Sequence, residues 1–387
     1  MQYLTSGESH GKKLNIIIEG APYGVSLSEE DINYELKRRS KGPGRSVRQD
    51  IEKNICSIIS GISNNKTTGN PICVEIANPN FDDFSDDYSN NQNNDEKFIP
   101  RPGHADLNGV MKYNMDDYSE VAQRASARET AARVVAGVVA KNILVELGCE
   151  VYSYVVSIGS ISIEENNTLM SEHLPKQADI AISKVLCPDM VATQEILSQI
   201  ERAKKAGDTL GGSFKIIATG VLPGLGSYSQ GYERIDSKLA ASIVSVPSVK
   251  SVEFGNIEHA HVSVGSSVVD QIHHDPVNGS ISRITNYSGG IEGGLTNGMP
   301  IVIKAAAKPI PTTTRPLKTI NLQSMEDITN SSKIRSDTCV VPNVAIICEN
   351  EVAWVLANEY LRKFGNDSMN DIKYAVDAYK QRLKTFK

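Results

Sequence analysis

Two histidines of this chain lie in short loops where glycine stands beside them. His10 belongs to the segment GESHG at residues 7–11, and His104 belongs to RPGHADL at residues 101–107. An imidazole changes its charge near neutral pH, so it can donate or accept a proton during a reaction. Glycine and proline suit loops that bring the backbone close to a ligand. Proton transfer is therefore one interpretation of each histidine, and an ordinary hydrogen-bonded loop residue is the other.

A basic run occupies residues 37–48, with six cationic side chains within twelve positions. Arginine binds phosphate and carboxylate groups through paired hydrogen bonds, and the Gly-Pro-Gly turn at residues 42–44 lets several side chains converge. We expect Lys37 and Arg38 to complement the end of a helix in solvent, and the whole run could do no more than that. The candidates for an anion pocket are Arg39, Arg45 and Arg48.

Two glycine-rich segments, GLGSY at 224–228 and SGGIEGG at 288–294, allow a flat or phosphorylated ligand to approach the backbone. Neither has the spacing of a dinucleotide fingerprint or a P-loop, and ordinary turns would also explain them. Asp337 follows Arg335 and Ser336, which makes it a candidate base or hydrogen-bond acceptor. A salt bridge within a turn is the alternative for this aspartate.

Composition and spacing exclude several classes of protein. A net charge of -6 argues against general affinity for nucleic acids, which requires a basic surface. No apolar stretch reaches the ~18 residues of a membrane span, and the polar start of the chain is unlike a signal peptide, so we expect a cytoplasmic protein. The histidine pairs 259/261 and 273/274 lack the partners of a metal site, and no metal is predicted. We expect idle thiols from the six cysteines, at positions 56, 73, 149, 187, 339 and 348.

Strand patterns and helix patterns alternate along the chain, which indicates sheets covered by helices. Ser28 predicts a helix start, and Ser126 with Glu129 predicts a capping box for a deeply buried helix that ends near Gly148. Residues 78–97 are rich in Asp and Asn and predict a flexible acidic surface loop. No linker divides the chain, so we expect one domain over residues 1–387, with an internal duplication as the alternative. Strands are expected at 14–19, 72–76, 151–158, 214–218 and 301–306, and further helices at 193–206, 236–246 and 349–364.

In order and spacing, eight segments resemble the chorismate synthase family across nearly the whole chain. They are GESHG (7–11), the arginines 39, 45 and 48, RPGHADL (101–107), RASARETAARV (124–134), GGSFKIIATGVLPGLGSY (211–228), NYSGGIEGGLTNGMPI (286–301), KPIPT (308–312) and RSDTCVVP (335–342). The resemblance implies a lyase that converts 5-enolpyruvylshikimate 3-phosphate to chorismate and phosphate by anti-1,4-elimination. It also implies reduced FMN without net redox change, an α+β fold in a single β-α-β-α layered sandwich, and a homotetramer.

The same resemblance implies roles for individual residues. His104 would assist the departing phosphate, His10 would protonate the reduced flavin, and Asp337 would lie near flavin N5. Ala125 departs from the family, because many relatives have serine there. The implied substrate-binding residues are Ser9, Arg39, Arg45, Arg48, Arg133 and Arg335, and Arg39 and Arg45 are also implied in NADP binding. The implied cofactor-binding residues are Arg124, Ala125, Ser126, Gly293, Lys308, Pro309, Ile310, Pro311, Thr312 and Arg335.

Two other functions compete with this one. A flavin oxidoreductase could move hydride from NADPH to an acidic substrate, but the chain has no dinucleotide fingerprint, and we expect an external flavin reductase instead. A nucleic-acid-binding module could use residues 37–48, but the run stands alone in an acidic chain and lacks stacking aromatic residues.

Overall fold

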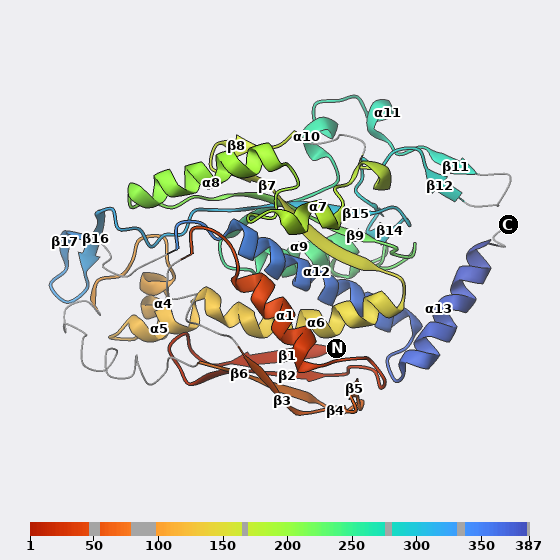
Figure 1. Cartoon of the computed structure of the whole chain (residues 1–387), viewed down its shortest axis with the longest axis horizontal. Helices are drawn as coiled ribbons and strands as arrows, with labels where there is room; N and C mark the ends of the chain where they lie inside the picture. The colour runs from red at the N-terminus through yellow and green to blue at the C-terminus, as the bar shows by residue number, and fades with distance from the viewer. Residues whose placement is uncertain (46–54, 79–97, 165–168, 275–280, 331–336, 385–387) are drawn as a thin grey trace.

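The computed structural model describes residues 1–45, 55–78, 98–164, 169–274, 281–330 and 337–384, and two antiparallel sheets frame it (Figure 1). The first sheet, at the bottom of Figure 1, is built from the N-terminal part of the chain, and the second from its middle. In spatial order, the first sheet contains β1 (Gln2–Ser6), β2 (Lys13–Glu19), β6 (Ile72–Ala77) and β3 (Cys56–Ser60). The second contains β10 (Val249–Phe254), β15 (Ile301–Ala307), β9 (Gly212–Thr219), β7 (Glu150–Ile158) and β8 (Ile161–Ser162).

Four helices fill the space between the sheets: α1 (Glu29–Ser40), α6 (Thr130–Glu146), α9 (Ile235–Val244) and α12 (Val341–Phe364). α1 and α6 pack against the first sheet, α9 and α12 against the second, and α6 lies along α12. On the far side of the second sheet lie α7 (Gln177–Ile182) and α8 (Met190–Lys205). The resulting order is sheet, helices, sheet, helices, which confirms the α+β class and the layered sandwich implied by the resemblance.

One hydrophobic cluster runs through both sheets and the helices between them. It includes Ile16 of β2, Val135 of α6 and Phe214 of β9, all of them fully buried. The side chains of β9 alternate between the two faces of the sheet. Ile217 points away from Phe214 and Ile216 and packs with Ile180 of α7 in a second, smaller cluster. The second sheet is therefore buried on both faces, as its Ile- and Val-rich strands require.

The remaining elements are short or peripheral. They are α4 (Asp106–Tyr113), α5 (Ser119–Arg124), α10 (Ile257–Ala260), α11 (Gly265–Val268), α13 (Met369–Lys384) and the two-stranded pairs β4 (Ile62–Ser63) with β5 (Lys66–Thr67), β11 (Ile272–His274) with β12 (Ile281–Arg283), β13 (Ile291–Glu292) with β14 (Leu295–Thr296), and β16 (Leu317–Asn321) with β17 (Glu326–Asn330). In the part of the chain that the structure describes, no helix is long and apolar enough to cross a membrane.

All five predicted strands are confirmed to within two residues at either end, and Ser28 caps α1 through a reciprocal hydrogen bond with Asp31. Three helix starts differ from the prediction. α8 begins at Met190, three residues before the predicted position 193. Ser126 caps a 3₁₀ turn at Ala127–Glu129 instead of α6 itself. α12 begins eight residues before the predicted position 349, because Pro342 stands in its first turn, where a helix tolerates proline.

The predicted acidic loop lies outside the described residues except at its first position. Asn78 is buried there, its side chain donates a hydrogen bond to the carbonyl of Gly11 at 2.9 Å, and its N–H donates to the carbonyl of Lys12. Position 78 was therefore wrongly included in a surface loop, because it continues β6 and holds the segment that contains His10.

Candidate active site

The loop that carries His10 connects β1 to β2 and is fastened to the end of α5. The N–H of Ser9 donates to the carbonyl of Gln123 at 3.2 Å, and the N–H of His10 donates to the Gln123 side-chain oxygen at 3.1 Å. The hydroxyl of Ser126 donates to the hydroxyl of Ser9 at 3.0 Å. A predicted substrate residue and a predicted cofactor residue are thus in direct contact. Gln123 is a residue that sequence reasoning missed.

Arg124 strengthens the same junction. Its guanidinium donates to the carbonyl of Gly7 at 3.0 Å and to the hydroxyl of Thr5 at 2.8 Å. Gly7 has a φ of 107°, and a Cβ at this position would lie 2.4 Å from the carbonyl oxygen of Lys13. Only glycine fits so close to the neighbouring backbone. The loop conformation around His10 is therefore set by hydrogen bonds from residues 123–126, with Ala125 between the contacting side chains of Arg124 and Ser126.

The loop that carries His104 folds around the carboxylate of Asp106 at the start of α4. Nδ1 of His104 contacts Oδ1 of Asp106, and Arg101 donates to the same carboxylate through Nε at 2.8 Å and through Nη2 at 3.0 Å. Burial acts to raise the pKa of Asp106, but the hydrogen bonds from His104 and Arg101 outweigh it and lower the pKa to about 2. Asp106 and Arg101 were not predicted as functional residues, although both stand in the motif.

The KPIPT segment lies against this loop. Nζ of Lys308 donates to the carbonyl of Gly103 at 2.9 Å, and a Cβ on Gly103 would lie 3.3 Å from Cβ of Pro311. The carbonyl of Ile310 accepts from the hydroxyl of Thr209 at 2.7 Å. Segments about two hundred residues apart in sequence thus meet, and the remaining predicted members, Pro309 and Thr312, lie within the same stretch.

Arg39 lies on the last turn of α1 and is buried, 6% exposed. Its guanidinium donates to the hydroxyl of Thr130 at 2.8 Å and to the carbonyl of Ala127 at 2.7 Å. The carbonyl of Arg39 in turn accepts from the side-chain amide of Asn343 on α12 at 2.5 Å. Arg39 is therefore held close to the start of α6, just after Ser126.

Arg45 and Asp337 form an ion pair, with Nη1 and Oδ2 3.3 Å apart. The segments that carry them are joined by a backbone hydrogen bond from Thr338 to the carbonyl of Gly44 at 2.6 Å. The structure therefore brings together a predicted substrate residue and a predicted catalytic carboxylate. Arg48 and Arg335, which were predicted to join them, lie outside the described residues.

Arg133 and Gly293 are not brought to these contacts. Arg133 binds Glu129 at 2.9 Å and the hydroxyl of Ser245 at 2.7 Å, and lies 3.6 Å from Glu351. Gly293 belongs to the β13–β14 hairpin, which meets the other glycine-rich segment through a hydrogen bond from Ser227 to the Gly294 carbonyl. That hairpin precedes β15, whereas Lys308 follows it. Gly293 and Lys308 are therefore separated along the chain by the seven residues of β15, which span roughly 20 Å.

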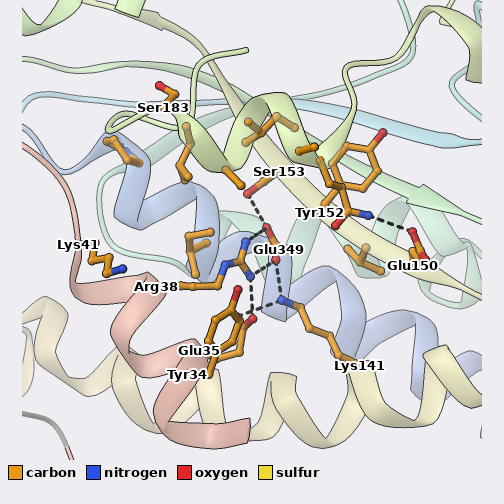
Figure 2. Close-up of a pocket in the computed structure, with 18 of the residues that line it drawn as sticks. Tyr34, Glu35, Arg38, Lys41, Lys141, Glu150, Tyr152, Ser153, Ser183 and Glu349 are labelled. Carbon is orange, nitrogen blue, oxygen red and sulfur yellow. Dashed lines mark hydrogen bonds and ion pairs between the residues drawn. The ribbon is translucent and has the colours of Figure 1, made fainter.

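A cavity of about 950 Å³ opens between α1, α6, α7, β7 and α12 (Figure 2). None of the predicted site residues is among those that line it in the described part of the chain. Glu349 forms its charged floor, accepting from Arg38 at 2.7 Å, Lys141 at 2.5 Å and Ser153 at 2.7 Å. The expectation that Arg38 serves a solvated helix end is wrong, because its guanidinium turns inward to this network and to Glu35.

Burial acts to raise the pKa of Glu349, but the charges of Lys141 and Arg38 outweigh it and lower the pKa to about 2. The network is therefore a set of satisfied ion pairs between helices. Among the described residues, no cluster of His, Cys, Asp and Glu could hold a metal ion, and the six cysteines form no disulfide.

Known proteins resemble this chain along its whole length. The sequence matches the chorismate synthase family over residues 1–361. Chorismate synthases of Bacillus velezensis and Listeria innocua are each 42% identical, over 394 and 392 residues, with 100% of both chains covered. A solved crystal structure of chorismate synthase matches with a TM-score of 0.82 and 35% identity, covering 100% of this chain and 98% of the other. The chain therefore belongs to the chorismate synthase family and is an enzyme of the lyase class.

Proposed function

We propose that this enzyme converts 5-enolpyruvylshikimate 3-phosphate to chorismate and phosphate, the last common step of aromatic amino acid biosynthesis. The contact between the His104 loop and the KPIPT segment supports this most directly, because it places the proposed acid for the leaving phosphate beside the proposed cofactor segment. In the reaction, the C3–O bond breaks with its electron pair leaving on the phosphate, and C6 loses a proton. C3 and C6 are attached to the two ends of the existing double bond of the ring. As the phosphate and the proton leave, this one double bond is replaced by two, without net oxidation.

The residues present fit a flavin mononucleotide. A flavin has polar ring edges, a flat apolar ring and a phosphate, so its site needs hydrogen-bond donors, apolar walls and a cation. The Ser126 hydroxyl, the prolines of KPIPT and the Lys308 ammonium group offer these. Ser126 contacts the His10 loop, and KPIPT contacts the His104 loop. Arg124 also holds the His10 loop through the carbonyl of Gly7. Reduced FMN supplies, when bound, the electron density that makes the elimination feasible.

The substrate carries one phosphate and two carboxylates, so its site needs several cations. Arg39 and Arg45 are the described candidates, and Arg48 and Arg335 remain predicted members. Arg133 also remains a prediction, although Glu129 and Ser245 already occupy its guanidinium. His10, close to Ser9 and Ser126, is the proposed proton donor toward the cofactor, and Asp337 beside Arg45 the proposed acceptor.

We further propose that the chain forms one domain and assembles as a homotetramer. One hydrophobic cluster joining both sheets supports the single domain. The outer face of the first sheet supports the assembly. Leu4 and Ile17 pair across β1 and β2 on this face and are 73% and 48% exposed, whereas the described helices contact the opposite face. A second copy would remove this apolar pair from water.

An anaerobic assay of phosphate release tests the reaction. We expect turnover with reduced FMN and substrate, and no turnover with oxidised FMN and no reductant. His104→Ala and His10→Ala should each lower kcat at least about tenfold, because acid–base groups contribute roughly 10²–10⁴. Activity in air without any reductant contradicts the proposed chemistry, and unchanged rates in the variants contradict the roles of the histidines.

Adding NADPH alone to oxidised FMN and the protein distinguishes the competing function. We expect no bleaching of the flavin absorbance, because an external reductase is needed. Bleaching by this protein alone would show that it reduces its own flavin.

A further inference from the structure

The side chain of Asp106 is buried completely and surrounded by donors. It accepts the Arg101 backbone N–H at 3.0 Å as well as two guanidinium N–H groups, and its Oδ1 also faces Nδ1 of His104. With its pKa lowered to about 2, Asp106 is a carboxylate throughout the physiological range. An ionised carboxylate has no proton, so it can only accept.

This fixes which nitrogen of His104 carries hydrogen. Nδ1 lies against an oxygen that can only accept, so Nδ1 must donate. In the other tautomer, Nδ1 would accept from Nη2 of Arg101, which lies 3.2 Å away, but its lone pair would then face Oδ1 of Asp106 at contact distance. The same Nη2 also donates to Oδ1 at 3.0 Å, so Asp106 keeps that donor in either tautomer. Two further charged groups lie next to this loop in the described part of the chain. Nζ of Lys308 binds the carbonyl of Gly103, and Arg315 lines a small hollow together with Arg101 and Pro102.

We propose that Asp106, clamped by Arg101, is a positioning residue that keeps hydrogen on Nδ1 of His104 and so presents Nε2 to the departing phosphate. This inference rests on the proposed function of His104. In the step, the proton on Nε2 of the imidazolium moves to a phosphate oxygen as the C3–O bond breaks and its electron pair leaves with that oxygen. His104 ends neutral with hydrogen still on Nδ1, so it needs no reorientation before solvent returns a proton to Nε2.

The test is Asp106→Asn, which keeps the size of the side chain but adds an N–H₂ group that can donate to Nδ1. Solid-state ¹⁵N spectra of the histidine-labelled full-length protein report the tautomer, and the resonances of His104 are those missing from His104→Ala. At a pH where the ring is neutral, we expect the Nδ1–H form in the wild type and a gain of the Nε2–H form in Asp106→Asn. We expect kcat to fall at least tenfold with KM changed less than threefold, because a wrong tautomer impairs the proton transfer and leaves binding intact. The exposed Asp116, changed to Asn, is the matched control and should alter neither readout.

Three results would overturn the positioning role. They are an Nε2–H tautomer in the wild type, an unchanged tautomer in Asp106→Asn despite lost activity, and a changed tautomer with unchanged kcat. The wild-type spectrum decides the tautomer even if the variant does not fold. Full turnover by His104→Ala would instead refute the proposed role of His104, so the two failures are distinguishable.

Discussion

Two buried glutamates two residues apart on α12 predict opposite responses to the same substitution. A separation of two residues turns the helix by about 200°, so Glu349 and Glu351 face opposite sides. Glu349 meets Arg38 and Lys141. Glu351 accepts from the hydroxyl of Ser242, and its nearest described cation lies 3.6 Å away. Burial raises the pKa of Glu351, and its hydrogen bonds and that cation only partly offset the rise.

Glu349→Gln should lower the free energy of unfolding by about 3 kcal/mol at pH 7. The folded protein lowers the pKa of Glu349 from 4.5 to about 2, and each unit corresponds to about 1.4 kcal/mol of preference for the ionised form. A second estimate agrees with this value, because removing one partner of a buried ion pair destabilises a protein by about 3–5 kcal/mol. Glutamine keeps the volume and an oxygen for Ser153, but leaves Arg38 and Lys141 with Glu35 as their remaining described carboxylate. Glu351→Gln should leave the stability unchanged or raise it slightly.

The pH dependence separates the two cases. The folded-state pKa of Glu349 lies below its unfolded value, so its contribution is present above about pH 4.5 and is lost as the pH falls toward 2. The difference between wild type and Glu349→Gln should close in that window. The folded-state pKa of Glu351 lies above its unfolded value. The stability that its neutral form contributes is therefore present below the unfolded-state pKa and is lost as the pH rises through the folded-state pKa.

Urea unfolding followed by fluorescence measures both variants, because the chain has one tryptophan. Trp354 lies on α12 and its ring packs edge-on against Tyr3 at 5.0 Å, so it reports the loss of packing around this helix. Equal destabilisation by the two variants, or no destabilisation by Glu349→Gln, would refute the reasoning from ion pairing.

Two further substitutions test the loop and the assembly. Gly7→Ala should lower turnover strongly, because its Cβ would overlap the carbonyl of Lys13. Gly24→Ala, with a φ of 91° and open space around it, is the control that measures the backbone strain alone, at about 1 kcal/mol. Thermal unfolding and the phosphate assay compare the two variants, and equal effects on turnover contradict the clash. Ile17→Glu should dissociate the tetramer in sedimentation velocity experiments, whereas Ile272→Glu on β11, where the isoleucine is even more exposed, should not; a tetramer that survives Ile17→Glu places the interface elsewhere.

Much of the fold follows from local patterns. Ile16 and Ile18 alternate with polar or exposed residues on β2, and that period identifies a strand with one buried face. The predicted start of α12 at 349 is eight residues late, and nothing local distinguishes a proline that ends a helix from one, like Pro342, in its first turn. Ser126 and Glu129 have the spacing of a capping box, but Glu129 binds Arg133 one helical turn further on, so an ion pair along the helix replaces the capping contact.

The candidate site was predicted by residue type but not by arrangement. The spacing of His104 and Asp106 within one motif was visible, and an imidazole two residues from a carboxylate could have been read as a pair. The contact between Gly103 and Lys308, and the pairing of Arg45 with Asp337, join segments that no local pattern relates. Arg38 and Arg39 are neighbours with the same chemistry, yet their side chains enter different networks. Only the direction of each side chain around α1 separates them.

The place of α12 in the fold has a consequence for how the protein is made. α12 contacts α1, α6 and α9 as well as β7 and β9, so it lies between the two sheets, yet it follows every strand of both sheets in the sequence and is synthesised after them. The N-terminal amino group even binds Asn358 on this helix, 357 residues away along the chain. The first sheet ends at Ala77 and α12 at Phe364, so at 5–20 residues per second roughly 15–60 s pass between their syntheses. A nascent chain that stops before α12 therefore exposes the face of α6 and the inner face of β7 and β9 that this helix covers in the folded protein.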